Sequence, residues 1–113
     1  MDDDTVDGLS ARLTAIASPQ RMRILAAVAA DPTHVSELAR RLGMSRALLY
    51  MHLQRLEEAG YLVGRFELSA DGKALKLFDV VPFDIRLDAD VIRSAVERSP
   101  ESSHAQQTEQ QEQ

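Results

Sequence analysis

The segment 35–63 constrains the fold of this chain more than any other, because it holds two helical patterns separated by a glycine. The first helix is expected to end at Gly43, since glycine adopts the left-handed backbone conformation at low cost. Ser45 is then a suitable N-cap for a second helix over residues 46–59, which contain neither proline nor glycine and are followed by Gly60. Two helices joined by such a turn predict a helix-turn-helix.

The second helix has two faces when its residues are placed at the helical period of about 3.6 residues. Leu49, Leu53 and Leu56 fall on one face, which we expect to be buried. His52 lies beside them and is expected to be a packed, hydrogen-bonded histidine. The opposite face and its flanks carry side chains that suit the major groove of DNA, namely Ser45, Arg46, Ala47, Tyr50, Met51, Gln54 and Arg55.

Each of these side chains has a chemistry that suggests a role. Arg46 and Arg55 would reach a guanine edge or a phosphate, and Gln54 would pair with adenine. Tyr50 and Met51 would contact a thymine methyl group or a sugar. Alternatively, Tyr50 and Met51 cover a neighbouring helix or a subunit interface, or they belong to a protein-interaction module that does not bind DNA.

After the second helix the sequence changes to an extended, alternating pattern over residues 61–69 and 74–81. Asp71 and Gly72 lie between them and are a strong hairpin signal, because both central residues of a tight hairpin turn must tolerate positive φ. We therefore expect an antiparallel hairpin, a wing, over residues 64–78. Its basic residues, expected near the DNA backbone or the minor groove, are Arg65, Lys73 and Lys76.

Helical patterns at both ends of the chain concern its assembly. One amphipathic helix precedes Pro19, which begins another helix, and Asp88 is a suitable cap for a final helix through Ser99. We expect the first and last helices to pair across a two-fold axis, which would hold two recognition helices about one DNA turn, roughly 34 Å, apart. The alternative is that both helices close the core of one monomer. The apolar residues expected at the dimer interface are Leu9, Leu13, Ile16, Val91, Ile92 and Val96.

The formal net charge of −5 is unusual for a DNA-binding protein, but acidic residues gather at the two ends of the chain. Residues 1–8 hold four Asp and residues 99–113 hold three Glu, and neither segment contains Lys or Arg. Residues 9–98 therefore hold thirteen basic and eleven acidic side chains. We expect an acidic N-terminal extension over 1–8, a winged helix-turn-helix domain over 9–98, and a disordered tail rich in Gln, Glu and Ser over 99–113.

Several motifs in this order resemble those of the ArsR-type winged-helix transcriptional regulators. They are Ser18-Pro19-Gln20-Arg21-Met22-Arg23-Ile24-Leu25, Val35-Ser36-Glu37-Leu38-Ala39, Leu42-Gly43-Met44-Ser45 and His52-Leu53-x-x-Leu56-x-x-Ala59-Gly60. The resemblance covers roughly residues 9–98. It implies a mainly α fold with a small antiparallel β hairpin and a homodimer that binds an inverted-repeat operator. It also implies that base-reading positions are occupied by Arg46, Tyr50, Met51 and Gln54.

The chain departs from the founding members of that family because it contains no cysteine. Those metal sensors carry cysteines where this chain has residues 36–38, so a thiolate site for arsenic, cadmium, lead or copper is excluded. Some relatives instead bind zinc through carboxylates and histidines of the final helix. Here Asp88, Asp90 and Glu97 have no histidine among them, and we expect neither a metal nor another cofactor.

The sequence predicts a double-stranded DNA-binding transcriptional regulator, a repressor, and not an enzyme. It has no Gly-rich phosphate loop, no recognisable nucleophile–base pair and no metal-ligand cluster. Met1-Asp2-Asp3-Asp4 is the opposite of a basic export signal, and no apolar stretch is long enough to span a membrane, so we expect a cytoplasmic protein. A small-molecule effector, a protein effector and no effector all remain open.

Overall fold

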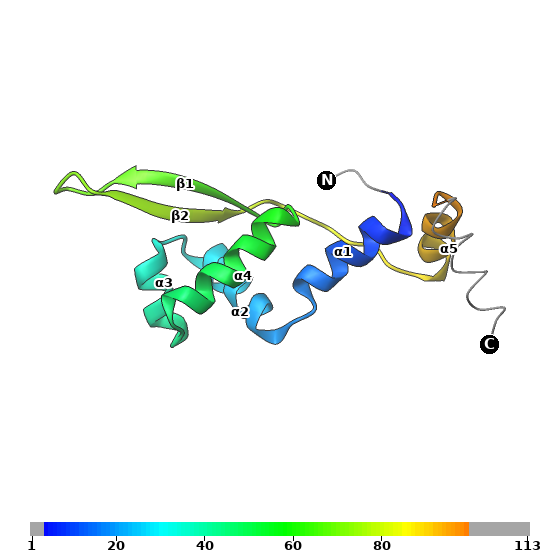
Figure 1. Cartoon of the computed structure of the whole chain (residues 1–113), viewed down its shortest axis with the longest axis horizontal. Helices are drawn as coiled ribbons and strands as arrows, with labels where there is room; N and C mark the ends of the chain where they lie inside the picture. Colours follow the sequence, from blue (N-terminus) through cyan, green and yellow to red (C-terminus); the bar gives the residue numbers. More distant parts are fainter. Residues whose placement is uncertain (1–3, 100–113) are drawn as a thin grey trace. The chain divides into compact units, whose positions relative to one another are not determined.

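The computed structural model describes residues 4–99, which form five helices and a two-stranded antiparallel sheet (Figure 1). The elements are, in order, α1 (Val6–Ile16), α2 (Pro19–Ala30), α3 (Val35–Leu42), α4 (Arg46–Glu58), β1 (Leu62–Leu68), β2 (Ala74–Val80) and α5 (Ala89–Glu97). This confirms the expected mainly α fold with one hairpin. Among the described residues, 15–83 form one compact unit, and 4–14 together with 84–99 form a second.

The helix-turn-helix forms as its turn residues predict. Gly43 has φ of +64° and the left-handed conformation, and the Met44 N–H donates to the Ala39 carbonyl at 3.0 Å, which closes the end of α3. The Ser45 hydroxyl accepts a hydrogen bond from the Leu48 N–H at 3.1 Å and caps α4. The regular part of α4 ends at Glu58, one residue earlier than expected.

The core of unit 15–83 is aliphatic and comes from every element of the unit. Tyr61 adds an aromatic contact, since its ring meets Phe83 edge to face at a centroid distance of 4.7 Å. α2 is capped by Ser18, whose hydroxyl accepts a hydrogen bond from the Arg21 N–H, and one face of α2 is buried in this core. The buried hydrophobic side chains are Ala15, Ile24, Leu25, Val28, Val35, Leu38, Ala39, Leu49, Leu53, Leu56, Tyr61, Leu62, Leu77 and Phe78, and His52 is buried among them.

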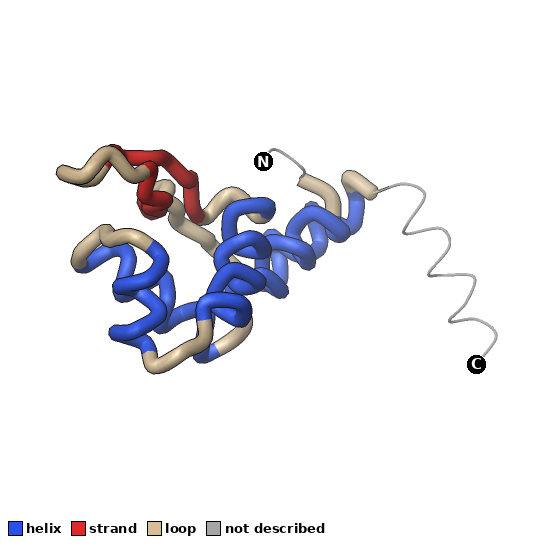
Figure 2. Tube along the Cα trace, turned by 60° about the vertical axis from the view of Figure 1, so that its left-hand side comes forward, coloured by secondary structure: helices blue, strands red, loops and turns tan. Residues whose placement is uncertain are grey.

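The hairpin pairs β1 with β2 in a register that runs from Leu62 opposite Val80 to Leu68 opposite Ala74. Its tip lies apart from the helices in both Figure 1 and Figure 2. The expected position of the turn is confirmed, but its expected form is wrong. Gly72 has φ of +86°, whereas Asp71 does not have a positive φ. The turn is longer than two residues because the Ser69 N–H donates to the Lys73 carbonyl at 2.8 Å, which leaves three residues between them.

The second unit holds the described ends of the chain together. The Val6 N–H donates to the buried Ser99 hydroxyl at 2.8 Å, and that hydroxyl donates to the Ala95 carbonyl at 2.7 Å. α1 begins at Val6, inside the segment expected as an acidic extension, and Ser99 of the expected tail is buried. The disorder expected for residues 100–113 falls outside the described residues.

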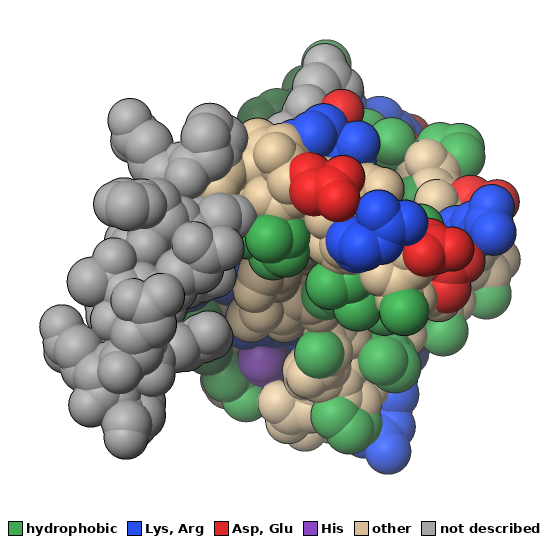
Figure 3. Space-filling model, turned by 90° about the vertical axis from the view of Figure 1, so that its right-hand side faces the viewer, with side chains coloured by type: hydrophobic (Ala, Val, Ile, Leu, Met, Phe, Trp, Pro, Cys, Tyr) green, Lys and Arg blue, Asp and Glu red, His purple; other side chains and the backbone are tan. Residues whose placement is uncertain are grey.

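The exposed surface of α5 is covered by paired charges. Asp88 caps the helix, as expected, by accepting from the Val91 N–H at 2.8 Å. One turn on, the Arg93 guanidinium lies 3.1 Å from the Asp90 carboxylate and 3.2 Å from the Glu97 carboxylate. Figure 3, in which α5 lies toward the viewer, shows basic and acidic side chains next to one another beside exposed apolar groups.

Candidate nucleic-acid interface

The outer face of α4 is open to solvent. Tyr50 is 48% exposed and Met51 is 47% exposed, while Leu49 and Leu53 on the opposite face are fully buried. Ala47, Gln54 and Arg55 are exposed as well. The division that the helical period predicts is therefore the one that the structure has. Tyr50 and Met51 are thus not buried beneath another helix of the same unit, and a role at a subunit interface stays an alternative.

The polar residues of α4 are held by neighbours at both ends of the helix. The Arg46 guanidinium donates to the Ser36 hydroxyl of α3 at 3.2 Å, which places the first side chain of α4 beside the start of α3. The Gln54 amide donates to the Glu58 carboxylate at 3.2 Å, and its amide oxygen is an acceptor that adenine can use. The Ser45 oxygen accepts the cap bond, and its hydroxyl proton remains available to donate to a DNA phosphate.

The three basic residues of the wing differ in their surroundings. The Arg65 Nε atom lies 2.6 Å from the Asp79 carboxylate, and its Nη1 atom lies 2.8 Å from the Glu67 carboxylate. These two hydrogen bonds raise the pKa of the guanidinium. Within residues 4–99, neither the Lys73 ammonium nor the Lys76 ammonium makes an ion pair.

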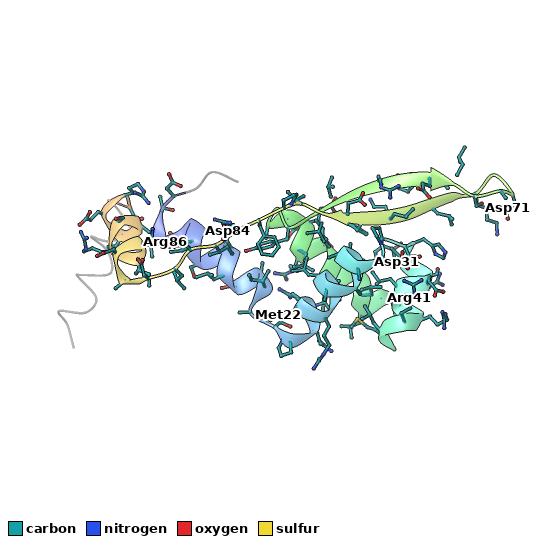
Figure 4. The ribbon with its side chains drawn as sticks, turned by 180° about the vertical axis from the view of Figure 1, so that it is seen from behind. Met22, Asp31, Arg41, Asp71, Asp84 and Arg86 are labelled. Carbon is teal, nitrogen blue, oxygen red and sulfur yellow. The ribbon has the colours of Figure 1, made fainter. Side chains whose placement is uncertain are left out.

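The basic residues of α3 are also paired, and the pairs connect α3 to the end of α2. The Glu37 carboxylate accepts from both Arg40 and Arg41, and these hydrogen bonds lower its pKa to about 2. Arg41 also reaches Asp31 at 3.0 Å, a pair visible in Figure 4. Arg40 and Arg41, which lie on the helix before α4, thus form ion pairs with carboxylates of their own unit.

A contact that the sequence does not reveal ties α4 to α2 on the buried side. The Arg21 Nε atom donates to the His52 Nδ1 atom at 3.1 Å, and the guanidinium also donates to the Ala15 carbonyl at 3.2 Å. His52 is therefore hydrogen-bonded, as expected. Because Nδ1 accepts, the neutral ring carries its proton on Nε2, for which the described residues offer no acceptor. Burial, followed by the charge of Arg21, lowers the pKa of His52.

The residues expected at a dimer interface are half-buried, except for the exposed Ile92. In the second unit Leu9 of α1 and Val91 of α5 line one cavity of about 150 Å³, so these two helices lie against each other. Ile16 is at the other end of α1 and belongs to unit 15–83. The described ends of the chain thus present apolar side chains from both terminal helices.

Within residues 4–99, no group of three or more His, Asp or Glu side chains is placed to hold a metal ion. In the same part of the chain, no helix combines the length and the apolar character needed to cross a membrane.

Comparison with known proteins extends these observations. The family model for bacterial regulatory proteins of the arsR family matches residues 18–62, which include α2, α3 and α4. Residues 18–62 thus resemble the helix-turn-helix segment of that family. Over these residues the chain is similar to bacterial regulatory proteins of the arsR family, which are not enzymes.

Individual relatives agree with this conclusion. An uncharacterized HTH-type transcriptional regulator of Methanocaldococcus jannaschii is 29% identical over 83 residues, which cover 74% of this chain and 86% of that protein. Two solved structures share the fold, each at 21% identity and a TM-score of 0.57. NolR from Sinorhizobium fredii is matched over 83% of both chains. A homodimeric winged helix-turn-helix DNA-binding domain from Mycobacterium bovis is matched over 86% of this chain and 80% of that one.

Proposed function

We propose that this chain is a transcriptional repressor that binds an inverted-repeat operator in double-stranded DNA as a homodimer. The observation that carries the proposal is the open face of α4, where Tyr50 and Met51 are about half exposed while the leucines behind them are fully buried. A helix held in this way at the surface of a helix-turn-helix is suited to enter the major groove.

The proposed contacts with DNA come from α4 and the wing. Arg46 and Gln54 read base edges, and Tyr50 and Met51 contact sugars or thymine methyl groups. The complete set is Ser45, Arg46, Ala47, Tyr50, Met51, Gln54, Arg55, Arg65, Lys73 and Lys76. Arg65 contributes least, because two carboxylates already surround its charge.

The proposed dimer uses the terminal helices, with Leu9, Leu13, Ile16, Val91, Ile92 and Val96 at the interface. The Mycobacterium bovis domain that shares this fold is described as homodimeric, which supports a homodimer here. A two-fold dimer presents two copies of α4 to DNA and thereby selects a palindromic site. Occupying such a site excludes other proteins from the same DNA, and this supports repression as the outcome. A small-molecule or protein effector would act on the dimer, in the cytoplasm where the DNA is held.

Selection of bound duplexes from a random pool tests this function. The full chain is expected to enrich palindromes whose half-sites lie about one helical turn apart. Failure to enrich any sequence would refute DNA reading by α4. Enrichment of single half-sites would leave DNA reading in place but refute the two-fold arrangement.

A second function is favoured by one specific observation, the exposure of large apolar side chains on β1. Phe66 is 67% exposed and Leu68 is 77% exposed, and together with Tyr50 and Met51 they offer an apolar surface to another protein. Salt distinguishes the two functions. The affinity for DNA falls steeply as the logarithm of the salt concentration rises, whereas apolar binding to a protein changes little.

A further inference from the structure

The two faces of the wing carry opposite net charge. Because side chains alternate along each strand and the register pairs Arg65 with Leu77, the Arg65, Glu67 and Asp79 side chains share one face. This face has one cation for two carboxylates, and both carboxylates contact Arg65. It is therefore poorly suited to approach a phosphate.

The other face of the wing carries Lys76 between two aromatic rings. The Lys76 ammonium lies 4.8 Å from the centroid of Phe66 and 5.4 Å from that of Phe78. Cation–π contacts of this kind fix the position of an ammonium group without neutralising its charge. Since Lys76 has no carboxylate partner among residues 4–99, its charge is available to an anion.

Gly64 lies on the same face, and because it has no side chain it leaves the space in which the end of the Lys76 side chain lies. A Cβ atom added at Gly64 would be 2.7 Å from the Lys76 Cε atom and 3.0 Å from Nζ. Gly64 does not have a positive φ, so its backbone accepts other residues without strain. Any side chain at position 64 would instead have to move the end of Lys76.

The ammonium borders a groove between the wing and the two helices of the helix-turn-helix. This groove, the wing groove, encloses about 240 Å³. Phe66 and Lys76 line it from the wing, Tyr50 from α4 and Ser36 from the first turn of α3. Besides Lys76, its lining residues therefore include Tyr50 and Ser36, whose hydroxyl groups can donate hydrogen bonds to an anion.

We propose that the wing groove binds one phosphodiester of the DNA backbone, with the Lys76 ammonium as its cation and Gly64, Phe66 and Phe78 as the residues that position it. This rests on the proposed function. When α4 lies in the major groove and the wing reaches the adjoining minor groove, the sugar–phosphate strand that separates the two grooves passes between α4 and the wing. The wing groove lies at that crossing, and the Tyr50 and Ser36 hydroxyls donate to the same phosphate.

Two variants test the charge of Lys76 and its position separately. Lys76→Met removes the ammonium and keeps an apolar side chain on the rings. Gly64→Ala keeps the charge but displaces the ammonium from its place between Phe66 and Phe78. Arg23→Met is the matched control, since Arg23 is an exposed cation of α2 that does not line the wing groove.

The measurement is the affinity of each full-length protein for the duplex selected by the wild type, as a function of salt concentration. Lys76→Met is expected to reduce the log–log salt slope by about 0.9 and, if binding at 1 M salt is unchanged, to weaken binding about eightfold at 0.1 M. Gly64→Ala is expected to change the slope in the same direction at unchanged thermal stability, and Arg23→Met is expected to match the wild type.

The outcomes separate this proposal from the proposed function. A wild-type slope in Lys76→Met, with DNA still bound, would overturn the wing groove as a phosphate site and leave DNA binding intact. A wild-type slope in Gly64→Ala would overturn the assigned position of the ammonium. If the wild-type protein selects no duplex at all, both proposals fail.

Discussion

The buried contact between Arg21 and His52 predicts that the helix-turn-helix unit loses stability in mild acid. His52 is only 6% exposed, and its Nδ1 atom, the site that a second proton would occupy, already accepts from Arg21 at 3.1 Å. Protonation would break this hydrogen bond and place two positive charges next to each other. Burial and Arg21 accordingly lower the pKa of His52 in the folded chain below its ordinary value.

The sign and the size of the effect follow from linkage. Above the ordinary histidine pKa of about 6.5, His52 is neutral in both the folded and the unfolded chain, and its contribution to stability is complete. As the pH falls below that value the unfolded chain binds a proton first, so the free energy of unfolding decreases until the pH passes the lowered pKa of the folded chain. The decrease attributable to one group is at most about 1.4 kcal/mol per pH unit.

Urea unfolding of the wild type and of His52→Gln between about pH 7.5 and pH 5 measures this contribution. The variant keeps an acceptor for Arg21 but does not titrate, so it is expected to lose less stability than the wild type over the same interval. Glu37 contributes little in this range, because its pKa of about 2 in the folded chain and its ordinary value of 4.5 both lie below it. Equal pH dependence of the two proteins would refute the reasoning.

Four further predictions concern α4, the wing and the dimer. Ser45→Ala is expected to lower the free energy of unfolding by about 1 kcal/mol, measured in urea, because α4 loses its cap; an unchanged midpoint would contradict this role. Arg46→Ala and Gln54→Ala are each expected to cost about 1 to 3 kcal/mol on the selected operator and to relax base preference, whereas an equal loss on random duplex would assign the residue to phosphate. Lys73→Ala at the hairpin tip is expected to weaken binding to all sequences similarly and to flatten the salt slope; a wild-type slope would remove the tip from the interface. Leu13→Glu is expected to sediment as a monomer, and a persistent dimer would exclude α1 from the subunit contact.

The elements that the sequence predicts well are those governed by neighbouring residues. Gly43 and Ser45 act within one helical turn of their own positions, and both have the conformation or the hydrogen bond that their residue types favour. The exposed face of α4 follows from the helical period alone. The hairpin turn was predicted less completely, because its length depends on the pairing of Ser69 with Lys73 and on the bond from the Lys73 N–H to the Ser69 hydroxyl.

The sequence does not predict which charged side chains of the site are paired, because the pairs form between residues that are distant in the sequence. Arg65 is a residue type that suits a contact with DNA. Its main partner, Asp79, lies 14 residues later in the sequence and is brought beside it by the strand register. Arg21 and His52 are 31 residues apart and belong to different helices. Without the register and the helix packing, the sequence does not show which basic side chains already have a partner.

These pairings bear on how a chain with a net charge of −5 would bind DNA, as proposed above. Net charge describes the chain as a whole, whereas a phosphate close to the surface interacts mainly with charges inside the Debye length of about 8 to 10 Å at ordinary salt. Carboxylates form ion pairs with both arginines of α3 and with Arg65 on the wing's acidic face. In the described part of the chain, the basic side chains that no carboxylate contacts include four on α4 and the wing, namely Arg46, Arg55, Lys73 and Lys76. The internal ion pairs thus leave these four cations without a carboxylate partner on the two elements that we propose to contact DNA.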